Sequence, residues 1–310
     1  MKTVVAVLTV LSVIIAFWYA ACLPMNIKGV LTEAERAGAE VTPAGAKERR
    51  DLSEFGLVLD NNFAIAATWA QDRPRLPAPH QVAVELWKTT GAMVLKGKMM
   101  SKRSLFYHGW VTLSATLLGF AIGTGLGILL AVGIVHSRVM DMSVMPWAIV
   151  SQTIPIIALA PMIIVVLYSV GVQGILPKAI ISAYLSFFPV VVGMVKGLRS
   201  PDAMQLDLLR TYSTSNTQGF WKLRLPSSTP YLFASCKIGI SASLVGTIVA
   251  ELPTGAKAGF GARMLVGDQY GQPILSWAAL FSAALTAAAL VGIISLIERS
   301  TLRKMGIKPA

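Results

Sequence analysis

The residue types best suited to chemistry lie inside or at the ends of long apolar segments. Glu251 directly follows the apolar run 238–250. A carboxylate at membrane depth often serves an ion or substrate path, whereas one at the end of a span is as often solvated or salt-bridged. Both interpretations of Glu251 stay open from sequence alone. Lys178 lies near the end of another apolar segment, where its long side chain can place the amine at the membrane interface.

A polar stretch that contains proline interrupts a third apolar segment. Ser151, Gln152 and Thr153 precede Ile154 and Pro155. Proline removes a backbone hydrogen bond, and the freed carbonyl must then face protein or water rather than lipid. The stretch therefore predicts either a packed kink or part of a polar path across the membrane. The candidate path residues are Ser151, Gln152, Thr153, Pro155 and Glu251.

No catalytic constellation is present in the sequence. The three histidines, His80, His108 and His136, have no partner at a metal-ligand spacing, and the two cysteines form no metal motif or disulfide framework. Neither a Gly-x-Ser-x-Gly elbow nor a Walker A sequence occurs. We expect no enzymatic activity, no bound metal and no cofactor. If ATP drives this protein, another chain must hydrolyse it.

Composition indicates a membrane protein. The 310 residues are 55% hydrophobic and 14% charged, against about 25% charged in soluble domains. The formal net charge of +12 fits either nucleic-acid binding or membrane topology. Because the sequence has no zinc-finger spacing and no basic stripe with interleaved aromatic residues, we exclude nucleic acid as a partner.

The apolar segments predict an all-α, polytopic membrane protein with about six transmembrane helices. They are residues 3–23, 110–135, 145–172, 174–195, 231–252 and 273–297. The first segment resembles a signal peptide in position. Its long run with Phe17, Trp18 and Tyr19 favours an uncleaved anchor. In the second segment, Gly119, Gly123 and Gly127 share one helix face, which predicts close helix packing.

The distribution of lysine and arginine predicts that both termini are cytoplasmic. Three domains follow: an anchor (1–24), an external segment (25–104) and a five-helix core (105–310) with a cytoplasmic loop (198–230). The basic cluster 96–103 lies on the external side and opposes this topology, but it ends a long loop, which largely escapes the rule. Within the external segment, residues 26–54 predict a solvated helix or a mobile stretch, and Pro79 begins an amphipathic helix expected on the membrane surface.

The cytoplasmic loop has a regular pattern of its own. Asp202 after Pro201 predicts a helix start. A turn is expected over 213–217, followed by a second short helix that ends at Pro226. Two short amphipathic helices on this face require a partner to cover their apolar side.

This loop resembles the EAA loop of permease subunits of binding-protein-dependent ABC importers of type I. That motif reads Glu-Ala-Ala, three residues, Gly, nine residues, Ile-x-Leu-Pro. Asp207-Leu208-Leu209 takes the Glu-Ala-Ala place, and Ser213 takes that of the glycine. The resemblance implies an ATPase-coupling loop comprising Asp207, Leu208, Leu209, Ser213, Phe220, Leu223, Leu225 and Pro226.

Further motifs are similar to the nitrate, sulfonate, taurine and pyrimidine branch of these permeases. They include Thr153-Ile154-Pro155, Phe188-Pro189 and Val249-Ala250-Glu251-Leu252. The resemblance implies a homodimer in the cell (inner) membrane, a separate cytoplasmic ABC ATPase and an extracytoplasmic solute-binding protein. The departures are leucines in place of two alanines and Ser213 in place of glycine. The alternative is a stand-alone secondary transporter or channel, for which Glu251 is the candidate ion-coupling carboxylate.

Overall fold

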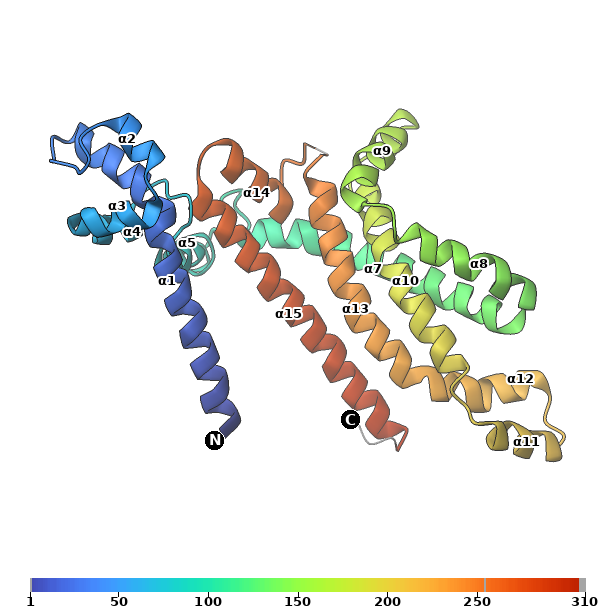
Figure 1. Cartoon of the computed structure of the whole chain (residues 1–310). Helices are drawn as coiled ribbons and strands as arrows, with labels where there is room; N and C mark the ends of the chain where they lie inside the picture. Colours follow the sequence, from blue (N-terminus) through green and yellow to red (C-terminus); the bar gives the residue numbers. More distant parts are fainter. Residues whose placement is uncertain (1, 254, 307–310) are drawn as a thin grey trace. The chain divides into compact units, whose positions relative to one another are not determined.

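The computed structural model describes residues 2–253 and 255–306, and every regular element within them is helical (Figure 1). Within those residues, five helices are long and apolar enough to cross a bilayer. They are α1 (Lys2–Arg36), α7 (Leu105–His136), α10 (Leu176–Leu198), α13 (Leu225–Glu251) and α15 (Pro273–Lys304). A bent pair of shorter helices, α8 and α9, makes a sixth span if the two halves are counted as one. The all-α polytopic fold is confirmed.

The chain divides into two compact units. The first contains residues 1–106 and 263–282, and the second contains 107–262 and 283–310. In the first unit, α1 continues beyond the predicted end of the anchor at residue 23. Four short elements follow it: α2 (Ala46–Asp51), α3 (Glu54–Asp60), η1 (Asn62–Ala64) and α4 (Ile65–Ala70).

Residues 26–54 begin as a largely exposed helix, as one expected alternative had it, but one face of this stretch packs into a lobe, so a mobile stretch was wrong. Ile27, Val30 and Leu31 of α1 are buried together with Leu57 of α3 and Ala64. Their spacing of three and four residues continues the face of α1, and the many intervening charges obscured it. We call residues 25–76 the N-terminal lobe.

Buried asparagines fix the irregular backbone of this lobe. Asn26 donates to the carbonyls of Thr68 at 3.0 Å and Leu76 at 2.8 Å, and it accepts from Leu76 N at 3.0 Å. Asn61 binds both backbone groups of Thr42 in the same way. The predicted amphipathic helix follows as α5 (Pro79–Thr89), with the short α6 (Gly91–Leu95) after it. Its position on the membrane surface stays a prediction.

In the second unit, α7, α10 and α13 approach one another through small residues. On the α10 side, a Cβ on Gly197 would lie 2.9 Å from Ser228 Cα of α13. Serine hydroxyls add hydrogen bonds between α10 and α13. For example, Ser182 Oγ donates to the Ser243 carbonyl at 2.9 Å. Figure 1 shows α10 and α13 running side by side. Such close contact gives interhelical packing without the aid of the hydrophobic effect.

The three glycines of α7 pack against α10, as predicted. A Cβ on Gly119 would overlap Ser182, one on Gly123 would overlap Ser186, and one on Gly127 would lie 2.9 Å from the Phe187 carbonyl. The glycine face is therefore a helix interface.

The third predicted span is broken. Its two halves, α8 (Arg138–Ser151) and α9 (Ile156–Ser169), are bent by 101°. Pro155 cannot donate to the Ser151 carbonyl four residues earlier, and the Tyr184 hydroxyl donates to that carbonyl instead. Each half has 14 residues, a length of about 21 Å against a hydrocarbon core of about 30 Å. The interruption was predicted correctly, and the segment forms two helices rather than one continuous helix over 145–172.

Three shorter helices remain. They are α11 (Ala203–Thr211) and α12 (Asn216–Gly219), between α10 and α13, and α14 (Phe260–Gln269), before α15. A π-helical turn, η2 (Phe220–Arg224), joins α12 to α13.

The glycine interface can be tested with a matched pair of substitutions on α7. Gly123→Ala places a methyl group against Ser186 and Ala183, whereas Gly125 has no heavy atom within 4 Å of the added Cβ. We expect Gly123→Ala to lower the stability of the detergent-solubilised protein by about 1–3 kcal/mol through overpacking. Gly125→Ala should leave the thermal midpoint unchanged or slightly raised. Equal midpoints for the two variants would show that α7 does not pack through Gly123.

Candidate coupling loop and buried carboxylate site

The loop between α10 and α13 begins with a capped helix. Asp202 is the N-cap residue of α11, and its backbone N–H donates to Gln205 Oε1 at 3.2 Å. This arrangement satisfies donors that a helix start leaves free. The helix start predicted at Asp202 is confirmed.

Ser213 ends α11 in a left-handed conformation, with φ of 53°. Its N–H donates to the Arg210 carbonyl at 2.9 Å, and Thr214 N–H donates to the Leu209 carbonyl at 3.2 Å. These two bonds form a Schellman motif, whose left-handed residue is usually glycine. The EAA loop has glycine at this place, so the chain keeps the turn although a serine occupies it at an energetic cost.

The second half of the loop runs without interruption into the membrane helix. Ser215 caps α12 by accepting from Gln218 N at 3.3 Å. The expected helix end at Pro226 was wrong, because α12, η2 and α13 form one span over Asn216–Glu251. The π-helical turn ends at Arg224, two residues before Pro226, and such a local adjustment accommodates a proline inside a helix.

One part of the loop is exposed. The Asp207 side chain is 66% exposed and pairs with Arg210 at 3.1 Å. Leu208 is 56% exposed, and Leu209 is partly buried. Met204, Tyr212 and Trp221 are exposed as well, although only their apolar periodicity could have indicated a role. These side chains form an apolar and acidic surface without cover from the described part of the chain.

The other part of the loop is anchored in the membrane core. Phe220 and Leu225 pack on the buried cluster of α7 and α10 that contains Ile134 and Met194. The Phe220 ring lies 5.1 Å from that of His136. The expectation that Phe220 lacks cover from its own chain was therefore wrong. Leu223 and Pro226 are partly buried. Phe220 and Leu225 therefore fix this part of the loop to a packed interior, which does not deform freely.

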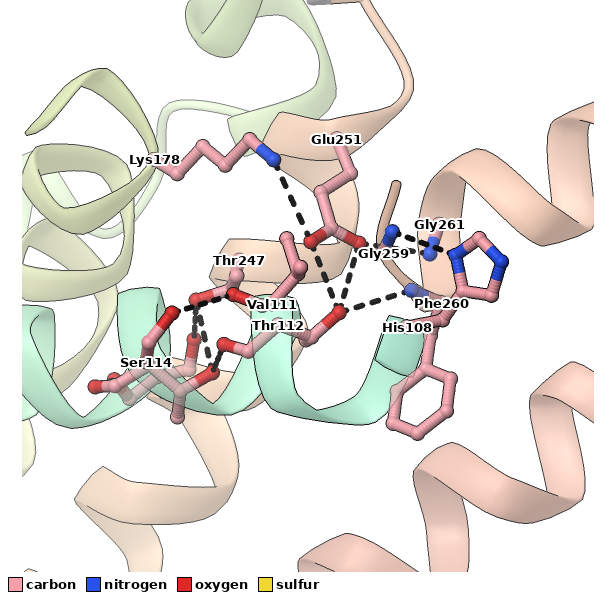
Figure 2. A network of polar contacts seen from close by, with 12 residues as sticks. His108, Val111, Thr112, Ser114, Lys178, Thr247, Glu251, Gly259, Phe260 and Gly261 are labelled. Atoms are coloured by element: carbon pink, nitrogen blue, oxygen red, sulfur yellow. Dashed lines mark hydrogen bonds and ion pairs between the residues drawn. The ribbon is translucent and has the colours of Figure 1, made fainter. Parts of the chain in front are cut away.

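Glu251 is completely buried at the other end of α13 (Figure 2). Thr112 Oγ1 of α7 donates to Glu251 Oε1 at 2.9 Å, and the Gly261 N–H donates to Oε2 at 2.8 Å. The Lys178 ammonium of α10 lies 3.7 Å from Oε1, with the lysine side chain 11% exposed. The carboxylate thus joins three membrane helices and the start of α14.

The segment before α14 is tied to the same site. The Gly259 N–H donates to His108 Nδ1 at 3.0 Å, and the Phe260 N–H donates to Thr112 Oγ1 at 2.9 Å. Gly259 has φ of 129°, and a Cβ there would overlap the Glu251 carboxylate. Two constraints therefore require glycine: the backbone conformation and the space that the carboxylate occupies.

This geometry supports the salt-bridged interpretation of Glu251 in the conformation described. Sequence reasoning missed Thr112 and His108, because a threonine and a histidine in an apolar helix carry no signal of a distant partner. It also placed Lys178 at the interface rather than against Glu251. Ser151, Gln152 and Thr153 lie at the α8–α9 turn, where Thr153 and Pro155 are exposed. A role for this turn in a path stays a prediction.

Comparisons with known proteins find similar chains among transport permeases. Residues 123–305 match the family model of the binding-protein-dependent transport system inner membrane component. The formylaminopyrimidine transport permease protein ThiX of Halalkalibacterium halodurans is 30% identical over 207 residues, which are 67% of this chain and 76% of the relative. The putative aliphatic sulfonates transport permease protein SsuC of Bacillus subtilis is 25% identical over 74% of this chain and 77% of its own. The nitrate import permease protein NrtB of Synechocystis is 26% identical over 54% and 58%.

The Glu251–Lys178 pair can be tested by its non-additivity. Glu251→Gln leaves a mostly buried ammonium without its carboxylate, so we expect a loss of about 3–5 kcal/mol in stability. Adding Lys178→Met removes that charge and should restore part of the loss. Thermal unfolding in detergent measures Glu251→Gln, Lys178→Met and the double variant. Glu48→Gln, at an exposed position, serves as the control. A double variant whose loss equals the sum of the single losses would exclude a coupled pair.

Proposed function

The chain belongs to the family of binding-protein-dependent transport system inner membrane components, and we propose that it forms the membrane path of an ATP-driven importer through which a small solute enters the cell. The observation that best supports this proposal is the division of the loop 202–226 into an exposed part and a buried part. Its exposed part presents Asp207 and Leu208, while Phe220 and Leu225 reach into the core of α7 and α10. Such a loop can receive force from outside the membrane and transmit it to the spans.

The proposed force comes from a cytoplasmic ABC ATPase that binds the exposed part of the loop. Asp207 and Leu208 would contact a cleft on that subunit, and Trp221 offers a large aromatic anchor of the kind that dominates interfaces. Closure of two ATPases would then rock the spans between inward- and outward-facing states. ATP is used by that partner, and this chain binds no cofactor of its own.

Two copies of the chain are proposed to form a homodimer in the cell (inner) membrane, with both termini in the cytoplasm. An extracytoplasmic solute-binding protein would deliver the cargo. The long apolar helices support the membrane location, and the bias of lysine and arginine supports the orientation.

The proposed cargo is a small solute of the nitrate, sulfonate, taurine or pyrimidine class. The relatives are named for a formylaminopyrimidine, aliphatic sulfonates and nitrate. The turn that contains Ser151, Gln152 and Thr153 is the proposed polar part of the path, because it brings partly exposed side chains into a broken span.

A secondary transporter that works alone is the less favoured function. Ion coupling needs a carboxylate that exchanges ions with water during the cycle. Glu251 has no exposed surface here and accepts hydrogen bonds from Thr112 and Gly261. This environment favours a fixed structural role over ion exchange.

The proposed coupling can be tested by reversing the charge at Asp207. We expect Asp207→Lys to weaken ATPase attachment by about 1.4 kcal/mol or more, equivalent to about tenfold in affinity, because it places a like charge beside Arg210 and loses the carboxylate. ATP-driven uptake into proteoliposomes should fall accordingly, with normal membrane insertion. Asp60→Lys makes the same charge change at an exposed position of the N-terminal lobe and serves as the control. Wild-type uptake and ATPase binding by Asp207→Lys would refute the coupling role of this residue.

A further inference from the structure

The N-terminal lobe contains a basic groove that the proposed transport mechanism does not use. The groove has a volume of about 480 Å³ and lies between α1, α2 and the segment 71–75. Residues 1–122 lie outside the match to the permease family. Six basic and two acidic side chains line the groove: Lys28, Arg36, Arg49, Arg50, Arg73 and Arg75, with Glu33 and Glu35.

The walls of the groove are held by contacts within the lobe. Arg49 is buried, forms an ion pair with Glu35 and donates to the carbonyls of Pro43 at 3.0 Å and Ala44 at 3.2 Å. These contacts join α1 to α2. On the opposite side, Gln71 donates to Glu33 Oε1 at 3.2 Å, which joins the segment 71–75 to α1. The groove therefore exists before any ligand binds.

Four guanidinium groups remain available at this groove. Within residues 2–253 and 255–306, the side chains of Arg36, Arg50, Arg73 and Arg75 form no hydrogen bond and no ion pair. The charge of one of them, Arg75, also acts on a neighbouring carboxylate. The hydrogen bond from Lys28 lowers the pKa of Glu54, and the charge of Arg75 acts in the same direction.

Arg73 and Arg75 also line a second hollow of about 610 Å³ with Trp277 and Leu280, which belong to the same unit. Their side chains therefore border open space on two sides. Arginine forks bind planar or tetrahedral oxyanions through paired, charge-assisted hydrogen bonds.

We propose that this groove is a binding site for a small oxyanion, such as a phosphate, sulfate, sulfonate or carboxylate group. Its volume lies within the range of small-ligand sites, about 300–1,000 Å³. Glu33 and Glu35 on the same lining would repel an extended acidic protein surface, whereas a small anion can contact the arginines and avoid them. If the groove collects anionic cargo on the outer side, that role rests on the proposed function. The proposal that the groove binds an oxyanion does not rest on it.

Equilibrium binding of radiolabelled inorganic sulfate to the full-length permease in phosphatidylcholine nanodiscs tests the proposal. We expect saturable binding that weakens by at least about tenfold in Arg73→Gln/Arg75→Gln, because two paired contacts are lost. The control Lys47→Gln/Lys88→Gln removes two positive charges from exposed positions of the same unit outside the groove. Its affinity should match that of the wild type, at constant ionic strength.

A second arm distinguishes a free anion from a lipid headgroup. Replacing part of the phosphatidylcholine with phosphatidylglycerol should leave sulfate binding unchanged if the site takes free anions. If the site takes a lipid phosphate, the anionic lipid should weaken sulfate binding to the wild type by competition. Either result supports an oxyanion site.

The proposal is overturned if sulfate does not bind, or if it binds wild type and Arg73→Gln/Arg75→Gln equally. It is also overturned if the arginine variant retains sulfate binding but fails to bind the solute-binding protein, since the groove would then be a protein-docking surface. None of these results depends on ATP-driven uptake, so failure here is distinguishable from failure of the coupling loop.

Discussion

The close approach of α7, α10 and α13 is the constraint on which the described site geometry depends. Glycines and serines at the contacts, such as Gly123 against Ser186 and Gly197 against Ser228, leave no room for larger side chains. The same packing holds Thr112, Lys178 and Glu251 together at one end of α13. Near the other end of α13, Phe220 packs on the buried cluster of α7 and α10. One continuous helical span, Asn216–Glu251, therefore connects the loop to the buried carboxylate.

The proposed coupling gives the two sites complementary roles. The exposed part of the loop would respond to a partner, and the buried part would pass the movement on. Glu251 fixes the far end, because its two oxygens bind groups from α7, α10 and the start of α14. An ion pair buried among its partners adds little net stability, but breaking it is costly. Such a site suits a fixed point about which helices move as units.

Long uniform patterns were predictable from the sequence, and tertiary exceptions were not. The apolar runs and the glycines at 119, 123 and 127 determine helices and one packing face, and both predictions were confirmed. The turn expected over 213–217 was found, and it begins with Ser213 in a left-handed conformation. The helix end predicted at Pro226 was wrong, because a π-helical turn before this proline lets the helix continue through it. The fold of residues 26–54 depends on Leu57 and Asn61, and the partner of Lys178 is 73 positions away in the chain; neither relation leaves a local pattern.

Site-specific photo-cross-linking from position 208 tests most directly whether an ATPase grips the exposed part of the loop. A benzophenone would be attached at Leu208→Cys after replacement of Cys22 and Cys236 by alanine. The assembled transporter would be irradiated with and without ATP, with Val84→Cys, an exposed position of α5, as the control. We expect a cross-linked product of this chain with the ATPase from position 208 only, and a change in its yield when ATP is added. A fully active transporter that gives no such product from position 208, or the same product from position 84, would contradict the coupling role of the loop.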